Sequence, residues 1–206
     1  VGIEFEAGHQ YDTYRSLRLL LPLFILLFSL GACLASRLLF RRISNPFYRD
    51  MSNTDYLTQL KNRNAYQLDI GNRIAGKAQE GTGFILLDLN GLKHVNDTLG
   101  HDAGDVYITC VSKAYLNMRT REAVMYRIGG DEFVVVMPDA DRDKIQDFMR
   151  RFGDMFNREA SMPEFTFSWG YSIYDPKADA DLYSTCRRAD KNMYMRKQQY
   201  YKNKNT

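Results

Sequence analysis

The 206-residue chain is poor in cysteine and carries little net charge. Its three cysteines, Cys33, Cys110 and Cys186, are odd in number and widely spaced, so they indicate neither a disulfide framework nor a zinc site and favour a reducing compartment. Twenty-eight basic residues against 25 acidic ones leave a net charge of +3, which is too small to indicate a nucleic-acid-binding surface by itself. No long heptad repeat is visible. The length suffices for one globular domain plus a short additional segment.

One long uncharged run, residues 19–36, is dominated by Leu, Phe, Ile and Ala and has arginine at both ends. Its length is near the lower limit for crossing a bilayer, and snorkelling of the arginine that follows would extend the membrane contact over 19–40. We therefore expect a transmembrane helix over 17–40, preceded by the end of a possible extracytoplasmic region at 1–16. A buried core helix is one alternative. A lipoprotein processing site at 30–33 is another.

Arginines are distributed unevenly around this run. Two precede it, at positions 15 and 18, and four follow it, at positions 37, 41, 42 and 49. Because positive residues concentrate on the cytoplasmic side of a membrane segment, the part after the run is predicted to be cytoplasmic. Residues 41–54 form a short juxtamembrane connector, in which Asn45-Pro46 interrupts any continuous helix. A globular domain is predicted over 55–206.

Hydrophobic periodicity predicts a mixed α/β (α+β) domain after the connector. Helices are expected over 64–79, 105–118, 143–156 and 181–201, and strands over 84–89, within a hairpin at 124–137, and over 165–174. This order is typical of a ferredoxin-like palm: an antiparallel central sheet with flanking helices packed on one face, here preceded by the N-terminal transmembrane helix.

Acidic residues follow two of the predicted strands. Asp88 ends the apolar run that begins at Phe84, and Asp131-Glu132 follow the glycine pair Gly129-Gly130 of the hairpin, where the glycines are expected to adopt positive φ. Adjacent acids at a turn are often only solvated. Three carboxylates gathered at strand ends would concentrate like charge, which a hard divalent cation makes tolerable. Oxygen ligands without a nearby Cys or His indicate Mg²⁺ or Mn²⁺ rather than zinc.

Four motifs then stand in a fixed order: Asp55-Tyr56-Leu57-Thr58-Gln59-Leu60-Lys61-Asn62-Arg63, the segment from Asp88 to Asp105, Gly129-Gly130-Asp131-Glu132-Phe133, and Ala189-Asp190-Lys191-Asn192-Met193-Tyr194. In these motifs the chain from about Asp55 to Lys204 resembles the GGDEF-domain diguanylate cyclases. The resemblance implies that two GTP molecules are condensed into cyclic di-GMP with release of two pyrophosphates. It also implies a homodimer, because each domain would hold one GTP, and a location at the bacterial inner membrane as a single-pass protein.

The resemblance also implies roles for individual residues. The metal would be held by Asp88, Asp131, Glu132 and the Leu89 carbonyl, with Asp131 as candidate proton acceptor and Lys93 balancing phosphate charge. Substrate contacts would come from Asn96, His101 and Asp105 at the guanine base, and from Gly129, Gly130 and Lys197 at the phosphates.

The chain departs from the family pattern at two places. Asn90 stands where an Asp is common, and Tyr200-Tyr201-Lys202-Asn203 replaces the usual Gly-Arg-Asn ending. The second phosphate-contacting arginine is therefore missing, and Lys202 is its candidate replacement.

Two other functions fit parts of the pattern. A non-catalytic nucleotide-binding or signalling module is one, although such modules lose the acids that this chain keeps at Asp88, Asp131 and Glu132. A nucleic-acid-binding protein that uses the basic stretch Arg187–Lys204 is the other. That stretch lacks a second basic strand with interleaved aromatic residues, so no nucleic-acid partner is expected.

Overall fold

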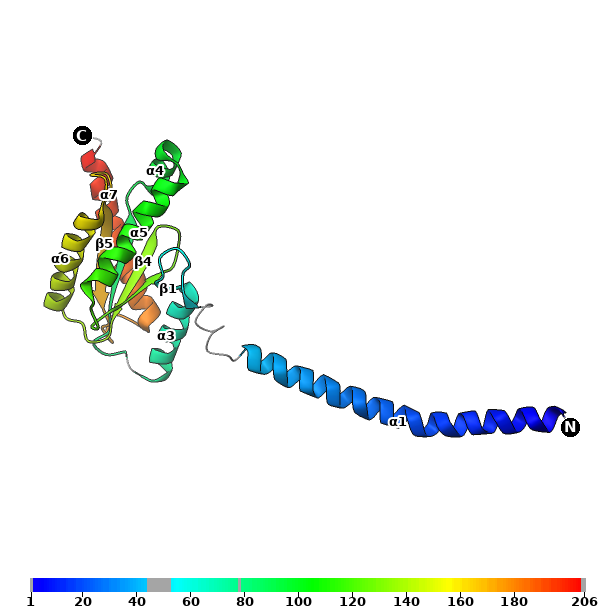
Figure 1. The fold of residues 1–206 in the computed structure, drawn as a ribbon. Coiled ribbons are helices and arrows are strands. Elements are labelled where there is room, and N and C mark those ends of the chain that lie inside the picture. The colour runs from blue at the N-terminus through cyan, green and yellow to red at the C-terminus, as the bar shows by residue number, and fades with distance from the viewer. Residues whose placement is uncertain (1, 44–52, 78, 205–206) are drawn as a thin grey trace. The chain divides into compact units, whose positions relative to one another are not determined.

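The computed structural model describes residues 2–43, 53–77 and 79–204 and divides into two compact units, residues 1–51 and 52–206 (Figure 1). The first unit contains helix α1 (Gly2–Ile43), which runs through Pro22. Its segment Leu20–Leu39 is 20 residues long with a mean hydropathy of 1.9, so it is long and apolar enough to cross a membrane. Most of the predicted connector 41–54 lies outside the described residues.

The second unit is built on a five-stranded sheet with the strand order β1-β3-β4-β2-β5. The strands are β1 (Lys61–Asn62), β2 (Gly83–Leu89), β3 (Val124–Arg127), β4 (Glu132–Met137) and β5 (Phe167–Ile173). The predicted antiparallel sheet is confirmed for β2 to β5. The two-residue strand β1, which is too short to have a periodicity, pairs in parallel with β3.

Helices cover both faces of this sheet, so the prediction of helices on one face was wrong. They are α3 (Arg63–Ala75), α4 (Leu92–Leu99), α5 (His101–Met118), α6 (Arg142–Glu159) and α7 (Leu182–Lys204) (Figure 1). Alternate residues of β2 separate two cores: Ile85 and Leu87 pack with α5 and α6, whereas Phe84 and Leu86 pack with α3 and α7. A strand that is buried on both faces reads as an uninterrupted apolar run, so this sequence signal was present.

The predicted helices agree with the structure to within three residues apart from α4, the start of α5 and the end of α3, which stops at Ala75, four residues before the predicted end. Helix α4 was not predicted, because its eight residues bury only Leu92 and Val95 and give too short a pattern. Gly91 and Gly100 bound it with positive φ values of 74° and 87°. Helix α5 begins at His101, four residues before the predicted start.

Helix α7 packs directly against the backbone of β5 at Gly170. A Cβ atom built on Gly170 would lie 2.1 Å from the backbone nitrogen of Met193, so only glycine allows this separation. The side chain of Met193 is buried in the same interface, together with Leu182 and Ala189 of α7. Gly170 therefore sets the position of α7 on the sheet.

Replacing Gly170 with alanine is expected to destabilise the domain by about 2 kcal/mol or more and to lower its thermal midpoint by roughly 5 °C or more, because the obstructing atom belongs to a backbone. The emission of Trp169, the single tryptophan of the chain, reports unfolding. Gly153→Ala is the matched control: its new Cβ meets open space within α6, so stability should stay equal or rise slightly. Equal effects of the two substitutions would contradict this account.

Candidate active site

Two acidic segments meet at one end of the sheet. Asp88, near the end of β2, is the cross-strand neighbour of Glu132 at the start of β4. The backbone N–H of Leu89 donates to the carbonyl of Asp131 over 3.2 Å. The structure therefore brings together the four residues for which metal ligation was predicted.

Asp88 is a buried carboxylate whose partner comes from α7. Lys197 Nζ lies 2.5 Å from Asp88 Oδ1, with side-chain exposures of 24% and 9%. Burial raises the pKa of Asp88 and the charges of Asp131 and Asp190 raise it further, although Lys197 offsets part of this effect. The pKa of Glu132 is raised as well, by burial and then by Asp131 and Asp88.

Lys197 takes a position that the sequence did not predict for it. It was expected at substrate phosphate, whereas in the structure it forms an ion pair with Asp88. Among the described residues, no three His, Cys, Asp or Glu side chains are grouped closely enough to hold a metal ion in this conformation. Asp190, which belongs to the fourth motif, was not assigned to the site, yet its charge acts on both Asp88 and Glu132.

In the hairpin turn, glycine provides space at position 129 and is not needed for a positive-φ backbone conformation. Neither Gly129 nor Gly130 has a positive φ, so the expectation of a positive-φ turn was wrong. The N–H groups of Ile128 and Gly129 both donate to the carbonyl of Glu132. A Cβ on Gly129 would lie 2.5 Å from Glu132 Oε2, whereas one on Gly130 would meet no atom within 4 Å. Gly129 therefore makes room for the Glu132 carboxylate.

The predicted base-binding residues lie on α4 and α5. Asn96 is half-buried against Gly104, where a Cβ atom would collide with the Asn96 amide oxygen. Gly104 directly precedes Asp105 in α5. The Asn96 amide therefore lies beside the backbone of the residue before Asp105. Asp105, His101 and Lys93 are exposed on these two helices.

Asn90, which stands where Asp is common in the family pattern, has a structural role here. Its side chain is buried, accepts from Ser168 Oγ over 2.8 Å and donates to Thr166 Oγ1 over 3.2 Å. Its carbonyl accepts from the Tyr107 hydroxyl. Asn90 thus ties β2, β5 and α5 together beside the acidic end of the sheet.

Comparison with known proteins identifies the second unit. The family profile described as "Diguanylate cyclase, GGDEF domain" matches residues 52–203. The chain belongs to the GGDEF-domain family.

The chain is similar to proteins named as diguanylate cyclases and to a protein named as a cyclic di-GMP phosphodiesterase. The probable diguanylate cyclase DgcJ of Escherichia coli K12 is 31% identical over 164 residues, covering 79% of this chain and 32% of that protein. The cyclic di-GMP phosphodiesterase PdeR of the same organism is 31% identical over 73% of this chain and 23% of its own length. The coiled coil and GGDEF domain of DgcB from Caulobacter crescentus, solved with c-di-GMP, is 27% identical with a TM-score of 0.65, covering 82% of this chain and 95% of that one. The chain spans about a third or less of the curated relatives named here.

Arg127 holds the GGDEF turn by hydrogen bonds, and sequence reasoning missed this role although Arg127 lies only two residues before Gly129. Arg127 Nη2 donates to the Gly130 carbonyl over 2.9 Å, and Nη1 donates to Asp55 Oδ1 over 3.0 Å. Asp55 also accepts from the backbone and the hydroxyl of Thr58. The first motif of the domain is therefore connected to the third through one guanidinium group.

The Asp55–Arg127 pair is largely sheltered, with side-chain exposures of 18% and 12%. Burial alone would raise the pKa of Asp55, but hydrogen bonds from Thr58 and Arg127 outweigh it and the pKa lies below the usual value. A carboxyl whose pKa is lowered on folding contributes stability above its unfolded pKa, and this contribution is lost as the pH falls through the folded value.

Asp55→Asn should therefore lower the free energy of unfolding at pH 7 by about 1.5–3 kcal/mol, the range for a hydrogen bond to a charged group. The difference from the wild type should persist down to about pH 4, the ordinary aspartate pKa, and shrink below it. Denaturant titrations followed by Trp169 emission at pH 7, 5 and 3 measure it. Asp154→Asn, which removes an exposed carboxylate of α6, is the control and should change little at any pH. A deficit of Asp55→Asn that stays constant to pH 3 would show that the charge is not responsible.

Proposed function

We propose that this chain is a diguanylate cyclase, which condenses two GTP into cyclic di-GMP and releases two pyrophosphates. The observation that carries the proposal is the convergence of Asp88, Asp131 and Glu132 at one end of the sheet of a GGDEF domain. A non-catalytic module has no need to maintain this group of acids, in which burial and then the neighbouring like charges raise the pKa of Asp88 and of Glu132.

The donor set at this end of the sheet fits Mg²⁺ or Mn²⁺. It consists of the carboxylates of Asp88, Asp131 and Glu132 and the carbonyl of Leu89, all oxygen donors of the kind that hard cations prefer. A bound divalent cation would supply positive charge to phosphoryl oxygens during transfer. Lys197 pairs with Asp88 in the structure. A substrate phosphate bound nearby would be an alternative partner for the Lys197 ammonium group.

The remaining residues bind and orient the substrate. The reaction joins a 3′ hydroxyl to an α-phosphate with pyrophosphate leaving, so the protein has to position two nucleotides and balance phosphate charge. Lys93 and Lys197 supply positive charge. The open space above Gly130 lets a phosphate approach the backbone of the turn. Asp131 is the candidate acceptor for the hydroxyl proton.

Guanine recognition is proposed for Asn96 and Asp105, with His101 beside them. Guanine presents N1–H and N2–H₂ donors along one edge, and a carboxylate paired with an amide is chemically matched to that edge. Adenine lacks the N2 amino group and a protonated N1, so Asp105 would be left without a donor. Gly104 supports this role, because it leaves room for the Asn96 amide next to Asp105.

Two further features of the proposal concern assembly and location. Each domain would hold one GTP, so closing a ring of two nucleotides requires two domains facing each other as a homodimer. The segment Leu20–Leu39 supports a single-pass anchor in the bacterial inner membrane. The excess of arginines after this segment supports a cytoplasmic GGDEF domain, where GTP is available.

Incubating the full chain in detergent with GTP and MgCl₂, followed by chromatography of the products, tests the function. We expect cyclic di-GMP and pyrophosphate from the wild type and at least a 100-fold lower rate from Asp131→Asn, because the substitution removes one carboxylate from the site. Asp139→Asn, at the opposite end of β4 and 94% exposed, should keep the wild-type rate. Wild-type protein that binds GTP but forms no product would contradict the enzyme and favour the non-catalytic module. Near-normal turnover by Asp131→Asn would remove that residue from the mechanism.

A further inference from the structure

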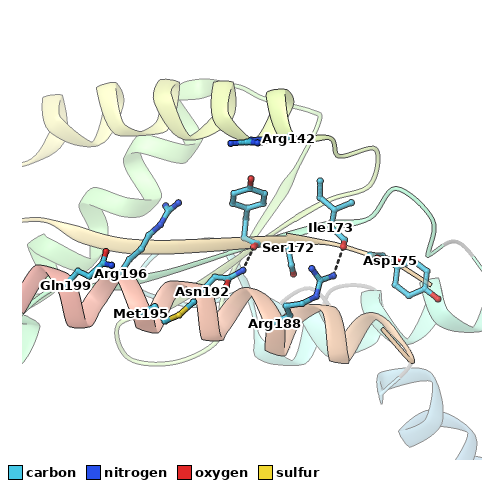
Figure 2. Close-up of a pocket in the computed structure, with 11 residues that line it drawn as sticks. Arg142, Ser172, Ile173, Asp175, Arg188, Asn192, Met195, Arg196 and Gln199 are labelled. Atoms are coloured by element: carbon cyan, nitrogen blue, oxygen red, sulfur yellow. Dashed lines mark hydrogen bonds between the residues drawn. The ribbon is translucent and has the colours of Figure 1, made fainter. Parts of the chain in front are cut away.

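A pocket of about 720 Å³ lies along the outer edge of β5, toward the end of the strand opposite the acidic residues. Figure 2 shows that its lining comes from three elements: Arg142 at the start of α6, the end of β5 with the segment after it, and α7. The volume falls within the range of 300–1,000 Å³ that is typical of small-molecule sites. No residue assigned to GTP or metal binding lines it.

Polar side chains of α7 already donate hydrogen bonds to the carbonyls of β5 that point away from the neighbouring strand β2. Arg188 Nη2 donates to the Ile173 carbonyl over 2.7 Å and Asn192 Nδ2 to the Tyr171 carbonyl over 2.9 Å, as the dashed lines of Figure 2 show. Arg196 continues the series at the Trp169 carbonyl over 3.3 Å. The donors are spaced four residues apart on α7, or about 6 Å, and the acceptor carbonyls two residues apart on β5, or about 6.6 Å. Because the two spacings are nearly equal, each donor lies opposite its own carbonyl. A strand from a partner protein would find these acceptors taken, and the pocket is therefore better suited to a small molecule.

The pocket has an excess of positive charge. Its lining contains three arginines and one acid, Asp175. Arg188 is neutralised by the buried Asp179, whose Oδ2 lies 2.5 Å from Nη2. Among the described residues, neither Arg142 nor Arg196 has a carboxylate within ion-pair distance. Two guanidinium groups therefore remain available to an anion.

Arg196 is preorganised for binding. Its guanidinium carbon lies 4.2 Å from the centroid of the Trp169 ring, and one of its N–H groups is held by the Trp169 carbonyl. A guanidinium fixed over an aromatic ring in this way loses little conformational entropy on binding and keeps donors free for phosphate oxygens. The ring of Tyr171, stacked against Trp169 with centroids 6.1 Å apart, supplies a flat, half-exposed surface in the same pocket.

We infer that this pocket is a second ligand site, which binds a nucleotide through its phosphate and its base. The phosphate is held by Arg142 and Arg196, and the base lies against Tyr171, since aromatic side chains accept any base by stacking. The site is separate from the proposed GTP site and does not require catalysis. Because Arg196 directly precedes Lys197, the partner of Asp88, its ligand contacts the same helix that completes the acidic site.

Titration of the full chain in detergent with guanosine 5′-monophosphate, in EDTA and without GTP, tests the proposal. Trp169 lies beneath Arg196, so its emission should change saturably. Arg142→Gln and Arg196→Gln should each weaken binding about tenfold or more, the effect of losing a charged hydrogen bond. Arg196→Lys, which keeps the charge without the planar stack, should recover only part of the affinity. Arg150→Gln, an exposed arginine elsewhere on α6, should bind like the wild type. Asp105→Ala, which alters the proposed GTP site, should keep the saturable change in Trp169 emission.

Pyrophosphate and guanosine separate the two parts of the ligand. We expect each to bind more weakly than the nucleotide, since each retains only the phosphate or only the base. Pyrophosphate binding as tightly as the nucleotide would overturn the role of Tyr171. A non-saturating titration, or one unchanged by both Arg142→Gln and Arg196→Gln, would overturn the site. Loss of binding in Asp105→Ala alone would place the signal at the GTP site.

Discussion

The arrangement of this domain depends on compensating the negative charge of the carboxylates at one end of its sheet. Burial raises the pKa values of Asp88 and Glu132 there, and the charges of Asp131 and Asp190 raise both further. Carboxylates this close are unfavourable without a cation. In the free protein the cation is the ammonium of Lys197, a residue of α7 that forms an ion pair with Asp88. This position of α7 depends on Gly170, because only a glycine lets α7 pack this closely on β5.

A second set of contacts holds the turn that carries two of these acids. Arg127 donates hydrogen bonds to the carbonyl of Gly130 and to the carboxylate of Asp55, so one guanidinium group links the hairpin to the segment around Asp55. Gly129 leaves the Glu132 carboxylate the space it occupies. Helix α7 meanwhile contacts both sites on successive residues: Arg196 lies over Trp169 at the edge pocket, and Lys197 lies against Asp88.

The parts of this structure that were predictable from sequence are those with a repeating local pattern. The run Phe84–Leu89, the hairpin around Gly129 and the main helices follow from hydrophobic periodicity and turn residues. The features that were missed depend on partners distant in sequence. The pairing of β1 with β3 and the hydrogen bonds of Arg127 are examples, and Lys197 meets Asp88 across 109 positions. The glycine pair was located correctly, but the reason for Gly129 is steric and so could be seen only once the Glu132 side chain was placed.

The central claim is that Lys197 compensates the buried charge of Asp88 in the free protein, and a double-mutant cycle tests it most directly. The free energy of unfolding would be measured in EDTA for the wild type, Lys197→Met, Asp88→Asn and the double variant. Since both side chains are mostly buried, we predict a coupling energy of about 1–3 kcal/mol. Lys197→Met should be clearly destabilising on its own and nearly neutral once Asp88 is Asn. Additive effects, with a coupling within about 0.3 kcal/mol of zero, would contradict the account.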